Sequence, residues 1–180
     1  MKTRIATDIT SEILTSDEAN TFIKFEDDDV SETSLIDSMI TAVRCHFEKR
    51  TGLSFIEKTY ETFFRCDEGP FYLPLSPVIS VDKVEKIDNE GTKTELTLNT
   101  DYFKRGFYDI EILPTLNSSD LFVTYKAGYG HTDTETLPGD LIEAMKRQIA
   151  QWYDNRDDFM ELNILGGIDK ILNTHRTTFV

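Results

Sequence analysis

The stretch from Leu121 to Tyr153 constrains the fold most, because its pattern changes from the period of a strand to that of a helix. Leu121, Val123 and Tyr125 share one face of an extended segment, which predicts a strand ending at the glycines of 128–130. Pro138 suits the start of a helix. Apolar residues at helical spacing follow it: Leu141, Ile142, Met145, Ile149, Trp152 and Tyr153. A strand leading into an amphipathic helix is a structural joint, and nothing in it indicates a catalytic apparatus.

The N-terminal third is predicted to hold an extended arm and two helices. Residues 1–14 form the arm, and Thr15 and Glu18 have the spacing of a capping box before a short helix. A second helix is expected from about Val30 to Thr51, with Gly52 as its stop. Its apolar stripe is Leu35, Ile36, Met39, Ile40, Val43 and Phe47. Acids outnumber bases strongly between residues 8 and 37, which predicts a negative face there.

Between residues 54 and 126 the apolar period shortens to two, which predicts strands. The first strand is expected over 55–62, and residues 88–91 read as a hairpin turn. A last helix is expected over 162–175, with Leu165 facing inward and Gly166 and Gly167 weakening its interior. The predicted fold class is α+β: a mainly helical framework, with two N-terminal and two C-terminal helices, and a small antiparallel β-sheet inserted between them.

Length and charge indicate the number of domains and exclude some classes of function. A chain of 180 residues predicts one domain over 1–180, divided into an arm and helices (1–52), a β-rich lobe (53–127), C-terminal helices (137–176) and a tail (177–180). The 33 acids against 19 Lys and Arg give a net charge of −14, which argues against a sequence-reading DNA-binding protein. No apolar run approaches the roughly 20 residues of a membrane span, so we expect no membrane partner.

Several groups could support chemistry, and a structural role is favoured for each. Cys45 and His46 are neighbours on a helix and point roughly 100° apart, so they do not share a site. Cys66 is distant from Cys45 and lacks metal-ligand spacing. Two acidic clusters lack the alternating pattern of a calcium loop: Asp27, Asp28 and Asp29; Asp154, Asp157 and Asp158. A third group, His131, Asp133 and Glu135, could ligate a metal from a loop but has no further partner in the sequence. The sequence therefore predicts no cofactor, no metal site and no catalytic residue.

An ordered set of motifs resembles the head–tail connector (adaptor) proteins of tailed bacteriophages, the type that docks beneath the portal. Its C-terminal part is a strand ending Tyr-x-Ala-Gly-Tyr and a proline-led helix closing on Tyr-x-Asn-Arg. The matching residues are Tyr125, Ala127, Gly128, Tyr129, Pro138, Trp152, Tyr153, Asn155 and Arg156. The Glu48–Gly52 helix end and the Leu-Pro-Leu-Ser-Pro-Val-Ile-Ser-Val segment from Leu73 also match. The likeness covers most of the chain in the right order.

The resemblance implies a structural virion protein rather than an enzyme. It implies a homo-oligomeric ring, dodecameric in such families, at the portal vertex between capsid and tail. The implied partners are the portal protein, the next tail protein and double-stranded DNA passing through the lumen without sequence-specific binding. The implied location is the virion, after assembly in the host cytoplasm. Candidate interface residues are Trp152, Tyr153, Arg156, Phe179 and Val180.

One alternative of another class remains open from the sequence. A metal-dependent hydrolase or nuclease would use the acidic loop clusters, provided that their carboxylates converge on one pocket. The scarcity of basic residues that would hold DNA counts against this alternative.

Overall fold

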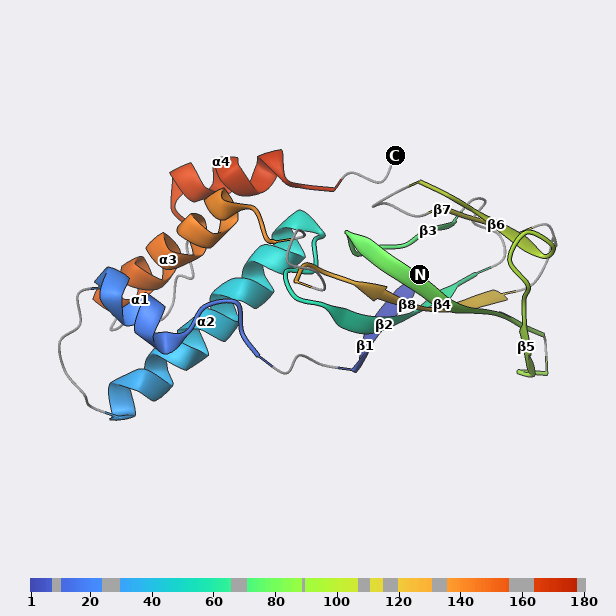
Figure 1. The fold of residues 1–180 in the computed structure, drawn as a ribbon, viewed down its shortest axis with the longest axis horizontal. Coiled ribbons are helices and arrows are strands. Elements are labelled where there is room, and N and C mark those ends of the chain that lie inside the picture. Colours follow the sequence, from blue (N-terminus) through green and yellow to red (C-terminus); the bar gives the residue numbers. More distant parts are fainter. Residues whose placement is uncertain are drawn as a thin grey trace.

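The computed structural model describes residues 1–7, 11–23, 30–65, 71–88, 90–106, 111–114, 120–130, 136–155 and 164–177. The molecule is elongated, with its helices gathered at one end and its strands at the other (Figure 1). No helix in these ranges is long and apolar enough to cross a membrane. The C-terminal end of α2 and the segment after it lie between the two ends of the molecule (Figure 1).

Four helices form one end: α1 (Ser16–Ile23), α2 (Val30–Thr51), α3 (Gly139–Asp154) and α4 (Gly166–Thr174). The capping box is confirmed, because Thr15 N donates to Glu18 Oε2 at 2.9 Å and Glu18 N donates to Thr15 Oγ1 at 3.2 Å. The predicted bounds of α2 are also confirmed, and Gly52 ends it with a φ of +76°. Local sequence signals therefore set the helix ends in this part of the chain.

Eight strands in the described ranges form two antiparallel sheets rather than one. The larger sheet has the order β1-β2-β8-β4-β5, and the smaller has the order β3-β7-β6. Their bounds are Lys2–Thr7, Lys58–Phe64, Phe71–Tyr72, Val78–Ile87, Lys93–Glu95, Tyr102–Arg105, Glu111–Pro114 and Asp120–Ala127 for β1 to β8. The α+β class is confirmed, but the mainly helical framework was wrong, because strands hold nearly as many described residues as helices.

Three local expectations need correction. The first strand of the β-rich region starts at Lys58 rather than Phe55, and Phe55 packs instead among the helices. The last helix starts at Gly166, so Gly166 and Gly167 form its first turn and do not interrupt its interior. Leu165 precedes that helix and is 39% exposed, so it does not face inward. Phe55 and Leu165 thus both lie outside the regular element that they were expected to join.

The first part of the predicted N-terminal arm is extended, and Lys2–Thr7 form strand β1 of the larger sheet. β1 pairs antiparallel with β2, and Arg4 lies opposite Glu61 in the register. The chain therefore starts at the edge of the sheet and crosses to the helical end before returning.

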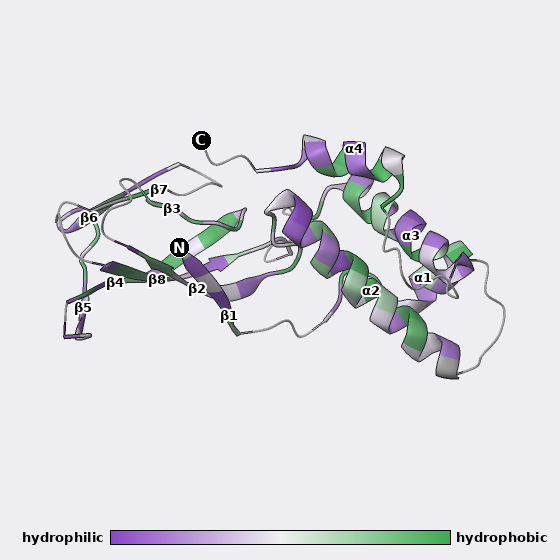
Figure 2. Cartoon of the chain, turned by 180° about the vertical axis from the view of Figure 1, so that it is seen from behind, coloured by the Kyte–Doolittle hydropathy of each residue, from purple (hydrophilic) through white to green (hydrophobic). Residues whose placement is uncertain are grey.

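Two separate clusters of buried hydrophobic residues hold the ends of the molecule. One lies among the four helices and includes Ile36, Phe47, Leu141 and Ile149. The other lies between the two sheets and is centred on residues such as Tyr125 of β8. Apolar and polar bands alternate along α2 and α3, as expected for helices buried on one side (Figure 2). The segment between α2 and β2 joins these two cores, and the charged site described next lies there.

Candidate functional site

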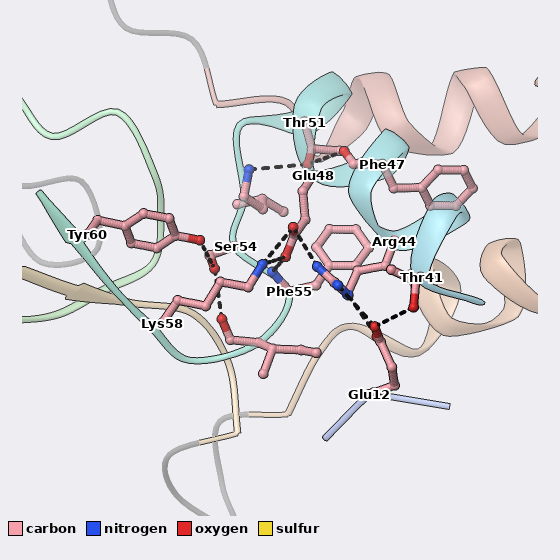
Figure 3. Close-up of polar contacts among 12 residues, drawn as sticks. Glu12, Thr41, Arg44, Phe47, Glu48, Thr51, Ser54, Phe55, Lys58 and Tyr60 are labelled. Carbon is pink, nitrogen blue, oxygen red and sulfur yellow. Dashed lines mark hydrogen bonds and ion pairs between the residues drawn. The ribbon is translucent and has the colours of Figure 1, made fainter. Parts of the chain in front are cut away.

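A buried ion network connects the helical end to the sheet end (Figure 3). Its centre is Arg44 of α2, whose side chain is only 5% exposed. Arg44 Nε donates to Glu12 Oε2 at 2.7 Å and Arg44 Nη2 donates to Glu12 Oε1 at 3.0 Å, a two-pronged contact. Arg44 Nη1 donates to Glu48 Oε2 at 3.0 Å, one helical turn further along α2. The guanidinium therefore holds the segment before α1 against α2.

Glu48 links Arg44 to the larger sheet, because it also contacts Lys58 of β2 (Figure 3). Lys58 Nζ, at the start of β2, donates to both carboxylate oxygens of Glu48 at 2.9 Å. The backbone N–H of Phe55 donates to Glu48 Oε1 at 2.8 Å. The Lys58 side chain is 2% exposed and that of Glu48 is 13% exposed, so both charges are largely removed from water. A single carboxylate thus joins α2, the α2–β2 connection and β2.

The electrostatics of the junction keep its charges fixed. Burial alone would lower the pKa of Arg44, but the hydrogen bond with Glu12 and the nearby Glu48 charge raise that pKa above its ordinary value. Burial also raises the pKa of Tyr60, whose hydroxyl lies 2.7 Å from Ser54 Oγ. Arg44 stays cationic and Tyr60 stays neutral near neutral pH. These groups are suited to holding a structure and not to exchanging protons.

Two hollows flank the network. One, of about 650 Å³, lies between the N-terminal segment and the start of the C-terminal helices, and its lining includes Glu12, Phe55 and Ile142. The other, of about 450 Å³, lies between β1, α2 and the loop at Pro74, and its lining includes Ile5, Cys45 and Tyr60. Lys58 lines both hollows. The network therefore separates two surface recesses, and the described residues that line them include no nucleophile with a positioned base.

Only some of the groups that could support chemistry lie in the described part of the chain, and the structure does not bring those into one site. Within the described ranges no cluster of three or more His, Cys, Asp or Glu side chains is suited to a metal ion. Cys45 is a free, half-buried thiol. The clusters at 27–29 and 131–135, together with Asp157 and Asp158, lie outside the described residues. Asp154 is described and ends α3.

The five candidate interface residues divide into two groups. Trp152 and Tyr153 are half-buried and pack against the helical core, and Tyr153 Oη donates to Glu32 Oε2 at 2.9 Å. These contacts are within one chain. Arg156, Phe179 and Val180 lie outside the described residues. The interface assignment therefore stays a prediction.

Reasoning from the sequence missed the network of Glu12, Arg44, Glu48 and Lys58. One local signal was present, since Arg44 and Glu48 have the i, i+4 spacing of a helical ion pair. Glu12 lies 32 residues from Arg44 in sequence, and no local pattern connects them. Arg44 lies beside Val43, within the apolar stripe of α2. A charged residue in such a stripe is a sequence signal that could have indicated a buried ion pair.

An exposed pair ties α4 back to α3 and predicts an acid-sensitive contribution to stability. His175 Nε2 lies 2.7 Å from Asp140 Oδ2, and the hydrogen bond from His175 is the main cause that lowers the pKa of Asp140. A lowered pKa means that the contact stabilises the fold above about pH 4 and is lost as the pH falls through the folded value. Because the Asp140 side chain is 49% exposed, the contribution is less than about 1 kcal/mol.

We expect D140N to lower the free energy of unfolding at pH 7 by less than about 1 kcal/mol, and the difference from the wild type to vanish near pH 3. Urea unfolding at pH 7, 5 and 3 measures the free energy of unfolding of both chains. D154N, at the opposite end of α3, is the matched control. A deficit of D140N that persists unchanged at pH 3 would contradict the assignment.

No family model matches the chain, and no curated protein does. Solved structures do match, over the whole chain. A neck of an empty gene transfer agent particle, computed with C6 symmetry, has a chain with a TM-score of 0.78 at 20% identity, and the match covers 100% of this chain and 97% of that one. The virion of a native gene transfer agent particle gives the same values. A neck of the native particle with C12 symmetry gives a TM-score of 0.71 at 22% identity, with the same coverage. At this identity the likeness establishes the fold.

Proposed function

We propose that this chain is a structural virion protein of the neck, which joins the capsid of a phage-like particle to its tail. The observation that carries this proposal is the match in fold over the whole chain to proteins in the necks of gene transfer agent particles. The ordered motifs around Gly128 and Pro138 point independently to the same class of protein. The proposal makes the chain a scaffold and not an enzyme, in keeping with a junction whose charges are paired with one another.

We further propose a ring of identical subunits at the portal vertex, with twelve copies, continuing the DNA channel used in packaging and delivery. The symmetric necks of the neighbours support a ring. The net charge of −14 suits a wall past which DNA slides without adhering. The portal protein would bind one end of the ring and the next tail protein the other, with Phe179 and Val180 as candidate portal contacts.

Light scattering behind a sizing column, over a concentration series and with negative-stain microscopy of the peak, tests the ring. We expect closed rings with a central hole, either from the chain alone or after mixing with portal protein. Co-purification of the full chain with portal protein, compared with a chain ending at Thr177, tests the contact of the last residues. A compact dimer that ignores portal protein and binds Mg²⁺ or Mn²⁺ at micromolar concentration would refute the proposal.

A further inference from the structure

After α4 the chain returns to the C-terminal end of α2 and is fastened there. Thr177 N donates to Thr51 O at 2.8 Å, and Thr177 Oγ1 donates to the same oxygen at 3.0 Å. Thr51 is the last residue of α2, so its carbonyl has no partner within the helix. Residues 175–177, the strap, thus complete the hydrogen bonding at the end of α2.

Gly52 forms the seat of the strap. A Cβ at position 52 would overlap Thr177 Oγ1 and would lie 3.7 Å from Thr177 Cβ. A side chain at this position would therefore displace the threonine hydroxyl, whereas glycine leaves room for it. Gly52 thus has two roles: its φ of +76° ends α2, and its missing side chain admits the strap to the Thr51 carbonyl.

Two further polar contacts hold α4 and the strap to the other helices. Arg50 Nη2, in the last turn of α2, donates to Asp169 Oδ1 of α4 at 2.6 Å. His175 Nε2 of the strap lies 2.7 Å from Asp140 Oδ2 of α3. The exposed fractions of these four side chains run from 25% to 49%, so water competes for both contacts. These contacts orient α4 and add little to its stability.

α4 has little stability of its own. Its nine residues are fewer than an isolated helix needs in water. Two glycines occupy its first turn, and its N-cap residue, Leu165, makes no side-chain capping bond. α4 packs against α2 and α3, and its buried residues are Ile168 and Leu172 (Figure 1). The docking of α4 therefore depends on two apolar side chains and on the strap.

We propose that α4 and the strap act as a latch, which opens as one unit while α1, α2, α3 and both sheets stay folded. Segments with few buried side chains and exposed polar contacts open at a lower free energy than the core. An open latch uncovers the part of the helical core that Ile168 and Leu172 cover, and it frees the strap from Gly52.

The latch provides a point of control over the helical core. The closed form keeps the apolar surface beneath α4 away from water. A partner that binds this surface draws the latch open, because a ligand shifts an equilibrium toward the form that it binds. The latch does not depend on the proposed ring, because Thr177, Asp169 and His175 all contact residues of their own chain.

Native-state hydrogen exchange of the full chain tests the opening. The backbone amides of residues 170–174 should be protected at least about 100-fold less than those near Val43 in the middle of α2. Equal protection at the two places would overturn the latch, because both would then exchange only through unfolding of the whole molecule.

A substitution in the strap tests whether the strap holds α4. T177V removes one of the two donors to Thr51 O and should speed exchange in α4 about fivefold, while exchange in the middle of α2 stays unchanged. T174V is the matched control, because Thr174 Oγ1 donates within α4, to Ile171 O at 2.7 Å. T174V should change exchange in α4 by less than about twofold. An effect of T177V no larger than that of T174V would overturn the role of the strap.

A disulfide across the seat should close the latch reversibly. Both natural cysteines are replaced (C45S, C66S), and G52C and T177C are introduced together. The 3.7 Å between a Cβ at position 52 and Thr177 Cβ lies within the roughly 3.5–4.5 Å of protein disulfides. Oxidation should slow exchange of residues 170–174 at least about tenfold relative to the reduced form of the same chain, so that strain at position 52 is common to both. A disulfide that fails to form under mild oxidation, or equal exchange of α4 in the two forms, would overturn the proposal.

Discussion

We expect R44M to lower the free energy of unfolding by about 3 kcal/mol, one of the two largest effects predicted for a single substitution in this chain. Methionine keeps much of the apolar stem of Arg44 and removes its charge. Glu12 then loses both hydrogen bonds from Arg44, and Glu48 loses one of its two cationic partners. The loss is near the lower end for buried ion pairs, because the Glu12 side chain is 23% exposed and remains partly hydrated.

Urea unfolding at pH 7 measures the effect, and R147M is the matched control. Arg147 also lies on a helix and pairs with a glutamate one turn away, Glu143, at 3.0 Å. Its side chain is 62% exposed, so R147M should change stability by less than about 0.5 kcal/mol. Equal effects of the two substitutions would show that burial of the network contributes nothing.

A double-mutant cycle with E12Q separates the Arg44–Glu12 contact from the rest of the network. The two residues contact each other directly, so their effects should not add, and we expect a coupling energy above about 1 kcal/mol. The contact also joins the segment before α1 to α2. R44M should therefore increase hydrogen exchange around residues 11–15 more than in α3, because α3 is held by its packing in the helical core.

The elements that could be predicted from the sequence are those whose causes are local. The capping box at Thr15, the end of α2 at Gly52 and the hairpin after β4 each depend on neighbouring residues, and all three are confirmed. The strand-to-helix joint at 121–153 is also confirmed, because its two periods are long enough to be distinct.

The parts that could not be predicted depend on residues distant in sequence. The order β1-β2-β8-β4-β5 places the first strand beside the second and the last strand in the middle, and no local period encodes such pairing. The separate β3-β7-β6 sheet likewise depends on how short strands pack across a core. The ion network draws on Glu12, Arg44 and Lys58 from three segments, so only the fold brings its charges together.

Gly128 combines one feature that the sequence predicts with another that depends on a distant segment. The sequence predicts a glycine that ends β8, and its φ of +133° confirms that an L side chain is disfavoured there. The sequence does not reveal the neighbour that the glycine admits. A Cβ at this position would overlap the carbonyl group of Ile56 and would lie 2.6 Å from the backbone N of Glu57. The end of β8 and the segment before β2 therefore touch backbone to backbone, and Glu57 N donates to Tyr129 O at 3.1 Å.

We accordingly expect G128A to lower the free energy of unfolding by at least about 3 kcal/mol. The unfavourable φ accounts for about 1–3 kcal/mol, and the displacement of the Ile56 backbone adds to it, because a backbone group cannot move aside as the end of a flexible side chain can. Gly130 is the matched control: its φ is +90°, but no heavy atom of the neighbouring described segments lies within 4 Å of the place that an alanine Cβ would take. The free energy of unfolding of G130A should therefore fall by only about 1 kcal/mol.

Thermal and urea unfolding of both variants measure the difference in stability between them. This difference separates the effect of the close approach of the two backbones from the strain of a positive φ. A G128A chain as stable as G130A would mean that the contact between β8 and the Ile56 segment yields freely, and the joint between the two halves of the molecule would then be looser than its hydrogen bonds imply.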